Sequence, residues 1–509
     1  MPELAIILAG LGDAFTLANL VFVALGVAAG QMVGAIPGIG PIMAMAIAIP
    51  FTFALDPLVA ISFLVGINKG GLFGGAIPAV LINTPGTPDA AATTLDGYPL
   101  ARSGKPVKAA RMALYASVTG DTVSDIVLIT LAAPLAGMAL MMGPVEILAL
   151  MIFAFSIIAG LIGDSLVKGL IAAVAGLLLA TVGLDPEHGT PRFYFGYFEL
   201  YDGASLVAVA IGMLAVAEIF RRIVAARRAG PQPTIALEGD GAAQRLRFGE
   251  YWGCRAAMAR GAAIGTLLGA IPGVGSTAAA FMSYAATKKA GRGDGPDFGA
   301  GNLRGIAATE SANSAVMGAN LIPLLGIGIP GSIGAALLIS AFMIHGIQPG
   351  PLLFRTQAQL IYGLFGAMLM ANLMNLLIGQ LSLRLWVRVI RAPESVIFPS
   401  ALLFCFVGVY LSTGGLFGVA LMLIAACVGY VMTALGYPVI VFIIAFFLGG
   451  GFESALSQSL VILDGNPLGV VGHPVALGLL ALAGVTVIWL GRGQRDKVDD
   501  KTAGDGQSD

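Results

Sequence analysis

Apolar segments long enough to cross a lipid bilayer recur along the chain, and they constrain its fold more than any other feature. The segment ASLVAVAIGMLAVAEIF, at residues 204–220, comes close to the about 20 apolar residues that a membrane-spanning helix needs. Only 11% of the residues are charged and the mean hydropathy is +0.91, whereas soluble globular proteins carry roughly 25% charged residues. We therefore predict an all-α polytopic membrane protein with about 10–12 transmembrane helices.

The charge and the reactive side chains exclude several classes of function. A formal net charge of −1 gives no electrostatic footprint for a nucleic acid. Three cysteines at unrelated spacings form neither a disulfide framework nor a metal motif. The three histidines are isolated, and a hydrolase pair such as Ser276 with His345 has no support in the spacing. We predict that the chain is not an enzyme and has no catalytic residue and no cofactor, with a sodium ion left open as coupling ion.

A glycine–proline break occurs twice in the same apolar surroundings. GAIPGIG at residues 34–40 returns as GAIPGVG at residues 269–275, an offset of 235 residues. After a polar insertion the offset becomes 245 and then pairs Asn68 with Asn313, Pro78 with Pro323, and PGT at 85–87 with PGS at 330–332. Internal repeats with discontinuous helices near the bilayer midplane are a common architecture of secondary transporters. The chain therefore contains two copies of one unit, each with two breaks.

Basic residues alternate between corresponding loops of the two copies. The loop after the first unit carries Arg102, Lys105, Lys108 and Arg111, but its counterpart offers only Arg355. The loop inside the second unit carries Lys288, Lys289, Arg292 and Arg304, whereas its counterpart has only Asp56. Since cytoplasmic loops are enriched in Lys and Arg, we predict that the two copies are inverted in the membrane.

The first break of each unit is predicted to be the tip of a re-entrant hairpin. Arg260 precedes the second GAIPGVG and Lys288 follows it, so both flanks are predicted to be cytoplasmic. The 27 residues between them are too few for two crossings, which need roughly 40 residues. We place the tips at the Pro-Gly pairs 272–273 and 37–38. A proline kink in an ordinary helix is the alternative.

The second break of each unit is richer in polar groups. It reads NTPGTPDAA at residues 83–91 and GIPGSIG at residues 328–334. Proline removes a backbone donor and glycine permits unusual dihedral angles, so the segment is suited to unwinding. Half-helix N-termini would then face an anion, and freed carbonyl groups could hold a cation. The alternative is a simple loop at the membrane surface.

Two charged residues lie inside apolar sequence. Lys69 follows Asn68 and precedes two glycines, and a lysine at membrane depth suggests a function by default. It is either the counter-charge for a carboxylate substrate, or a residue that snorkels to an interface or pairs with Asp121 or Asp125. Glu310 leaves a similar choice open between handling a coupling ion or proton and structural pairing.

Further crossings are predicted around the two units. Before the second unit they fall at residues 112–142, 145–163, 169–184 and 203–220, and after it at 357–383, 396–412, 415–434, 437–453 and 473–490. The predicted domains are a first inverted-repeat unit (1–111), scaffold helices (112–220), a cytoplasmic linker (221–255), a second inverted-repeat unit (256–356), scaffold helices (357–491) and a disordered cytoplasmic tail (492–509).

With these breaks in place, the chain resembles the TctA family, the large membrane subunits of bacterial tripartite tricarboxylate transporters. The resemblance runs from about residue 18 to the last membrane segment. Its most specific pieces are GAIPGIG, NTPGTPDAAATTLDGYPLARSGKP and LIPLLGIGIPGSIGAALLISAFMIHGIQPGPLLF, which occur in this order. Where the family commonly has an aromatic residue before the paired glycines of the first unit, this chain has Lys69.

The resemblance implies a secondary active importer of the bacterial inner membrane. Its substrate would be a small tricarboxylate or dicarboxylate, taken up by symport along a sodium or proton gradient. Its partners would be a small membrane subunit similar to TctB and a periplasmic solute-binding protein similar to TctC, and a homodimer is left open. An anion channel with two re-entrant pore loops and a non-transporting membrane scaffold are the competing hypotheses.

The resemblance and the repeat together give a set of candidate substrate-binding residues. In the first copy these are Pro37, Gly38, Gly40, Asn68, Lys69, Thr84, Gly86 and Thr87, and in the second copy Gly273, Gly275, Ser276, Asn313, Ser314, Gly331 and Ser332. Sodium sites, if present, would use the backbone of the same breaks. For the mechanism we expect an elevator, in which the hairpins and broken helices move as a transport domain against a scaffold of the remaining helices.

Overall fold

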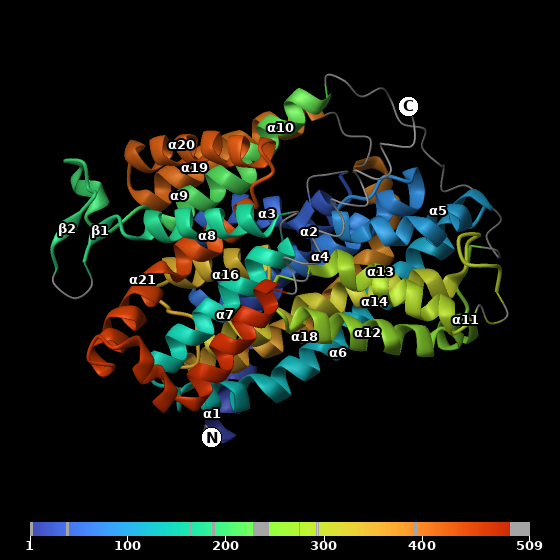
Figure 1. Cartoon of the computed structure of the whole chain (residues 1–509). Coiled ribbons are helices and arrows are strands. Elements are labelled where there is room, and N and C mark those ends of the chain that lie inside the picture. Colours follow the sequence, from blue (N-terminus) through green and yellow to red (C-terminus); the bar gives the residue numbers. More distant parts are fainter. Residues whose placement is uncertain are drawn as a thin grey trace, which may run out of the picture. The chain divides into compact units, whose positions relative to one another are not determined.

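The chain is almost entirely helical (Figure 1). The computed structural model describes residues 4–36, 40–162, 165–185, 189–226, 244–273, 275–291, 293, 295–389 and 394–488. Within these ranges six helices are long and apolar enough to cross a membrane, namely α2, α4, α6, α18, α20 and α21, and seven more apolar helices are shorter. The prediction of an all-α polytopic membrane protein is thereby confirmed, while the exact number of crossings stays a prediction.

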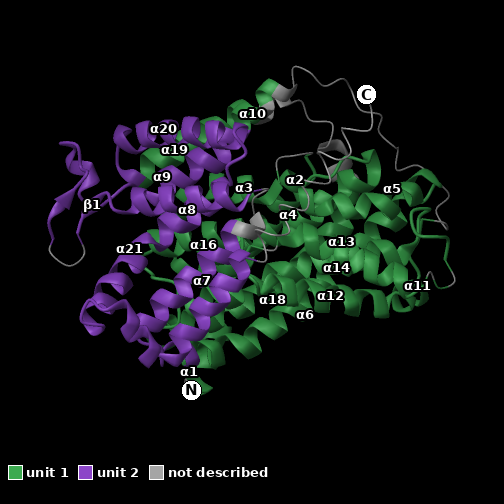
Figure 2. Ribbon diagram, viewed as in Figure 1, with its two compact units in different colours: residues 1–137, 219–412 green, residues 138–218, 413–509 purple. Residues whose placement is uncertain are grey.

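The helices fall into two compact units, each assembled from two separate stretches of chain (Figure 2). Unit 1 comprises residues 1–137 and 219–412. Its elements are α1 (Leu4–Ala14), α2 (Leu17–Gly34), α3 (Gly40–Ala48), η1 (Ile49–Ala54), α4 (Pro57–Ile82), η2 (Pro88–Thr93), α5 (Thr94–Arg102), α6 (Pro106–Ala139), α10 (Ala217–Ala226), α11 (Phe248–Gly253), α12 (Arg255–Gly269), α13 (Gly275–Lys289), α14 (Leu303–Ala319), α15 (Leu321–Ile327), α16 (Ile333–Ile344), α17 (Leu353–Thr356), α18 (Ala358–Val389) and α19 (Glu394–Thr413).

Unit 2 comprises residues 138–218 and 413–509. Its elements are α7 (Pro144–Ile162), α8 (Leu166–Ala180), the antiparallel strands β1 (Gly183–Leu184) and β2 (Pro191–Arg192), η3 (Phe198–Leu200), α9 (Leu206–Ala210), η4 (Ile211–Val216), α20 (Leu416–Ala434), α21 (Val439–Ile462), η5 (Pro467–Gly472) and a last helix at 474–488. Arg192 binds Glu453 of α21 with 3.0 Å between Nη2 and Oε2, and this contact ties the strand pair to the unit.

Helices lie at each of the crossings predicted around the two repeat units. The run from α9 through η4 to α10 is continuous and covers the crossing predicted at 203–220. α21 continues to Ile462, beyond its predicted end at 453. Residues 227–243 of the predicted linker, and the predicted tail, lie outside the described residues. The predicted domain boundaries stay predictions.

A stripe of glycines on α2 lets its backbone approach that of α4. A Cβ atom at Gly26, Gly30 or Gly34 would lie 2.3, 2.1 or 2.3 Å from a backbone oxygen of α4. Only glycine fits at such distances, which is the usual basis of close helix packing in membranes, where lipid tails remove the hydrophobic advantage of larger side chains. These contacts hold α2 against α4, the helix that ends at the second break of the same copy.

The second copy repeats this packing with α12 and α14. Cβ atoms at Gly261, Gly265 and Gly269 would lie 2.7, 2.2 and 2.8 Å from backbone oxygens of α14. These glycines stand 235 residues after their counterparts in α2, and the oxygens that they approach stand 245 residues after theirs. The two offsets found in the sequence therefore correspond to the same helix–helix contact, made twice.

The second hairpin folds back on itself at the GAIPGVG break. α12 ends at Gly269 and α13 begins at Gly275. A Cβ atom at Gly261 would lie 3.1 Å from the hydroxyl of Ser283, so residues well before and well after the break are neighbours. A kink in one continuous helix would place them far apart, so this segment is a helical hairpin. Its side of entry into the membrane stays a prediction.

Candidate functional site

The second break of the first copy is an unwound segment with a helix end on each side. α4 ends at Asn83, whose φ of 54° is left-handed, and the N–H of Thr84 donates to the carbonyl of Pro78 with 3.4 Å between N and O. The next element begins at Thr87, whose hydroxyl accepts from the N–H of Ala90. This is an ordinary N-cap, in which a side-chain oxygen accepts from an N–H group of the helix end.

The second copy builds the same segment from different residues. α15 ends at Gly328 with a φ of 78°, and the N–H of Ile329 donates to the carbonyl of Pro323 over 3.2 Å. The hydroxyl of Ser332 then accepts from the N–H of Ala335 and caps α16. Each of these residues stands 245 positions after its counterpart. Thr87 and Ser332, two of the polar residues predicted at the second breaks, are thus the N-cap residues of two equivalent helix ends.

Described residues of the first break contact the second break in each copy. The N–H of Gly86 donates to the carbonyl of Gly75 over 3.1 Å, and a Cβ atom at Gly86 would lie 2.2 Å from the carbonyl oxygen of Gly34. In the second copy, the N–H of Gly273 donates to the carbonyl of Gly331 over 3.1 Å. Both breaks of a copy therefore form one continuous backbone surface.

The two copies also contact each other inside unit 1. The side-chain amide nitrogen of Asn68 in α4 lies 2.9 Å from the sulfur of Met317 in α14. A Cβ atom at Gly334 in α16 would lie 2.6 Å from the same nitrogen of Asn68. The hydroxyl of Thr277 in α13 donates to Asp89 of η2 over 2.8 Å. Residues of the first copy thus lie against the helix that begins at the second break of the other copy.

Asn313, the counterpart of Asn68, is a buried amide without a hydrogen-bond partner in the described structure. It is 1% exposed, and neither its amide oxygen nor its nitrogen has a hydrogen-bond partner within the described part of the chain. An unpaired buried amide costs free energy, so native proteins keep few of them without a reason. A bound solute that accepts from one atom and donates to the other would satisfy both. The neighbouring Ser314 is already paired, with 2.6 Å between its hydroxyl and that of Ser117.

The remaining predicted residues vary in how closely they join this surface. A Cβ atom at Gly40 would lie 3.5 Å from the methyl group of Thr87, whereas one at Gly275 would meet no atom within 4 Å. The hydroxyl of Thr84 donates to the carbonyl of Ile82 over 3.2 Å. Ser276 lies at the start of α13 and is half-buried. Pro37 and Gly38 lie outside the described residues.

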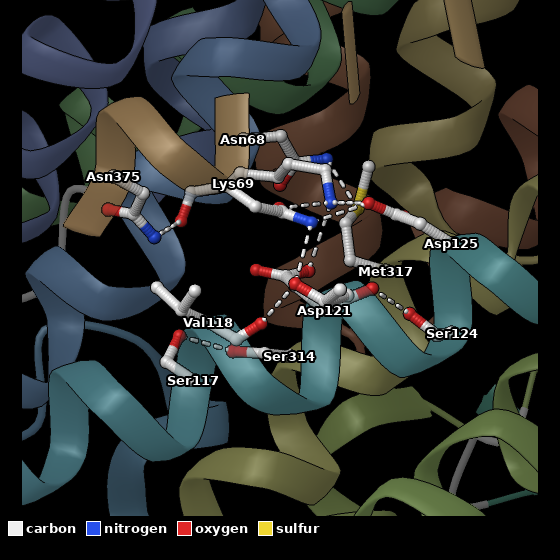
Figure 3. A network of polar contacts seen from close by, with 12 residues as sticks. Asn68, Lys69, Ser117, Val118, Asp121, Ser124, Asp125, Ser314, Met317 and Asn375 are labelled. Atoms are coloured by element: carbon white, nitrogen blue, oxygen red, sulfur yellow. Dashed lines mark hydrogen bonds and ion pairs between the residues drawn. The ribbon is translucent and has the colours of Figure 1, made fainter. Parts of the chain in front are cut away.

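Lys69 is fully buried and uses its ammonium group on three protein partners (Figure 3). Its Nζ lies 2.8 Å from Oδ2 of Asp125, 3.3 Å from Oδ1 of Asp121 and 2.9 Å from the amide oxygen of Asn372. An ammonium group has three donors, so these contacts use all of them. Of the two readings of Lys69, the structure therefore supports pairing with the carboxylates of α6, and the counter-charge role stays a prediction.

Glu310 is also fully buried, but its contacts differ. The hydroxyl of Thr93 donates to its Oε1, and that hydroxyl lies 2.9 Å from the hydroxyl of Thr309. Its Oε2 has no partner, and no ion pair among the described residues includes Glu310. Asp89 is a charged neighbour of the same sign. Hydroxyl groups, not a cation, thus hold this carboxyl in the described structure.

Sequence reasoning missed the polar residues that α18 contributes. Asn372 binds Lys69 and Asp125, and Asn375 accepts from the amide of Gln31 in α2 over 2.7 Å. The signal was present, because two asparagines three positions apart share a helix face and stand out in the apolar sequence of α18. No repeat counterpart drew attention to them.

A pocket of about 400 Å³ lies elsewhere in unit 1. It is lined by residues of α6, α11 and α18, including Tyr115, Phe248, Tyr251 and Gln380. None of the predicted substrate-binding residues lines it, so the candidate site rests on the breaks and not on this pocket.

Comparisons with known proteins agree with the resemblance seen in the sequence. A family model described as the tripartite tricarboxylate transporter TctA family matches residues 20–444. The chain is 34% identical over 495 residues to an uncharacterized 52.8 kDa protein in the TAR-I ttuC' 3'region of Agrobacterium vitis, covering 96% of this chain and 97% of the relative. It is 34% identical over 224 residues to an uncharacterized protein in the TAR-II ttuC' 3'region of the same organism, covering 44% of this chain and 92% of that relative. No solved structure matches the chain.

Proposed function

This chain belongs to the TctA family of tripartite tricarboxylate transporters, and from that premise we propose that it is the translocating subunit of a secondary importer of small carboxylates. The family is one of transporters and the chain is a multi-pass membrane protein. The proposal adds the substrate class, a tricarboxylate or dicarboxylate, and uptake across the bacterial inner membrane driven by a sodium or proton gradient.

One observation carries the proposal, the paired breaks that meet inside unit 1. Thr87 and Ser332 each cap a helix that begins at a break, and helix N-termini favour anions because their N–H groups and dipoles point outward. Asn313 adds a buried amide without a partner in the described structure. Discontinuous helices whose N-termini face a substrate carboxylate are typical of secondary transporters built from repeats.

The candidate substrate site therefore centres on Asn68, Asn313, Thr87 and Ser332, together with the glycines of the breaks. The proposed partners are a small membrane subunit similar to TctB and a periplasmic binding protein similar to TctC, since the family is tripartite. We keep the elevator as the proposed mechanism, with the hairpins and broken helices as the moving part. No catalytic residue is proposed.

The competing hypothesis is an anion channel, and reconstituted uptake separates the two. The chain would be placed in liposomes with its small subunit, candidate binding proteins, labelled carboxylates and imposed sodium or proton gradients. We expect solute accumulation above the external concentration that needs a gradient and a binding protein. Flux that only equilibrates the solute, and that ignores both, would contradict a secondary transporter and favour the channel.

A further inference from the structure

When all three side chains are ionised, the cluster of Lys69, Asp121 and Asp125 carries one negative charge more than its lysine can balance. All three side chains are fully buried, and they bring one positive and two negative groups together (Figure 3). Removing a charge from water without a partner is expensive, and a second carboxylate here would have no cation of its own. The neutral state of the cluster has Lys69 protonated, one carboxylate ionised and the other carboxyl protonated.

The hydrogen bonds distinguish the two carboxyl groups. Oδ2 of Asp125 accepts from Lys69 and from the amide nitrogen of Asn372, each over 2.8 Å. Charge-assisted bonds of this length favour the ionised form. Asp121 has a single, longer contact of 3.3 Å to Lys69 through Oδ1. Each carboxyl also has one buried oxygen without a partner in the described structure, Oδ2 of Asp121 and Oδ1 of Asp125, so the two groups differ in the number and length of the bonds that they accept. Asp125 is therefore the more closely bound partner of Lys69, and Asp121 is the carboxyl better placed to carry a proton.

We propose that Asp121 is the proton-binding site of this transporter, with Lys69 and Asp125 as a fixed ion pair beside it. The inference rests on the proposed function in giving this proton a role in uptake. The carboxylate of Asp121 takes up one proton at Oδ2 from water and releases it again, with no other reactant. Intramembrane carboxyl groups of this kind are the usual carriers of protons in pumps and transporters.

A proton fits this position better than a metal cation does. The ammonium group of Lys69 already occupies the place between the two carboxyl groups, so a metal ion cannot bridge them there, whereas a proton needs only one oxygen atom. No other charged side chain in the described structure faces Asp121. α18 contributes the neutral Asn372, and α14 contributes Ser314 and Gly318 to the surroundings of α6.

The proton site lies directly beside the candidate substrate site. Asn68, which touches the start of α16, is the residue before Lys69, and Ser117, one turn before Asp121, binds Ser314 beside Asn313. A Cβ atom at Gly318 would lie 2.6 Å from Oδ1 of Asp125, so α6 and α14 have no spare room here. A change in the charge of Asp121 would therefore act on the neighbouring helices, which line both breaks.

Infrared difference spectroscopy on the purified full-length protein tests the proton directly. Subtracting the spectrum of Asp121→Asn from that of the unaltered protein isolates the absorption of this one carboxyl. We expect the C=O band of a protonated carboxyl, which shifts in D2O and disappears as the pH is raised. A difference that shows only ionised carboxylate bands, or a band that never titrates, would overturn the proposal. Loss of the band on adding sodium at constant pH would also overturn it, because the site would then bind the metal.

A second variant keeps the test decisive if Asp121→Asn does not fold. Glu310→Gln removes another fully buried carboxyl, one that no cation contacts in the described structure, so a protonated-carboxyl band that remains in this variant does not come from Glu310 and is expected of Asp121. Absence of any such band in Glu310→Gln would overturn the proposal.

The role in transport is read from uptake under an imposed pH gradient. The unaltered protein is expected to respond to the gradient and Asp121→Asn to lose that response, whereas an equal response in both would overturn the coupling role. If the unaltered protein takes up no carboxylate under any gradient, the proposed function fails, and the infrared result still decides whether Asp121 binds a proton.

Discussion

Thr87 and Ser332, which stand 245 residues apart in the chain, cap two equivalent helix ends by accepting from the N–H three positions further on. The hydroxyl is the only side-chain feature that the two residues need to share for this bond. Both copies therefore make the same cap bond next to the same Pro-Gly pair, although one copy uses threonine and the other serine.

The caps predict a matched effect of removing either hydroxyl. Thr87→Val and Ser332→Ala should each destabilise the protein by about 1 kcal/mol, the typical cost of losing an N-cap. Ser332→Thr keeps the hydroxyl and should retain stability. Thermal unfolding in detergent measures the effect, and full stability of Ser332→Ala would show that the cap contributes nothing.

The glycine stripes predict a sharp contrast between two alanine substitutions. Gly265→Ala would push a Cβ atom to 2.2 Å from the carbonyl oxygen of Ala312, so α12 and α14 must separate. We expect a loss of folded protein, because overpacking of this kind typically costs about 1–3 kcal/mol. A Cβ atom added at Gly137 in α6 would meet no neighbouring atom within 4 Å. Gly137→Ala should therefore raise helix stability by about 0.5–1 kcal/mol.

Folded yield and melting temperature in detergent compare these two variants. Equal behaviour of Gly265→Ala and Gly137→Ala would contradict the close packing of the second hairpin arm.

Much of unit 1 could be predicted from the sequence because its repeat is marked by proline and glycine, which interrupt helices. Pro78 and Pro323 stand 245 residues apart, as do the left-handed residues Asn83 and Gly328. Proline and glycine act on the backbone conformation locally, whatever residues surround them. For the same reason an interruption at residues 269–275, between α12 and α13, can be predicted from the sequence.

The partners of Lys69 could not be decided from the sequence. The spacing of Asp121 and Asp125 puts both on one face of a helix, but which face meets α4 depends on packing between segments far apart in the chain. Asn372 completes the set from a third helix, 303 residues away. The division of the chain into two discontinuous units likewise arises from contacts that no local pattern contains.

The contact between Lys108 and Glu250 predicts a pH dependence at the end of α6. Partial burial works to raise the pKa of Glu250, but the hydrogen bonds from Lys108 and from the backbone N–H of Arg247, together with the charges of both residues, outweigh it and hold the pKa below its ordinary value of 4.5. A carboxyl whose pKa is lowered on folding stabilises the folded state above its ordinary pKa and loses this effect as the pH falls through the lowered value.

Melting curves of the unaltered protein and Glu250→Gln over a pH series check this sign. At neutral pH the unaltered protein should melt at the higher temperature, and the difference should vanish in acid below the lowered pKa. A difference that grows toward acid would contradict the assignment.

If the substrate site is correct, leucine substitutions of Asn313 and Gln31 should separate an effect on uptake from an effect on stability. Asn313→Leu removes an amide without partners in the described structure, so stability should be unchanged or higher, while uptake is lost. Gln31→Leu breaks the bond to Asn375 in the same unit and should lower stability by about 0.5–1.5 kcal/mol. The pair controls for the general effect of placing leucine at a buried amide.

The most direct test of the central claim is the initial rate of gradient-driven carboxylate uptake by Asn313→Leu, measured in liposomes at equal amounts of folded protein. If the paired breaks bind the substrate, the variant retains its melting temperature and loses uptake at substrate concentrations that saturate the unaltered protein's rate. Uptake equal to that of the unaltered protein, with the same dependence on substrate concentration, would contradict a substrate site at these breaks.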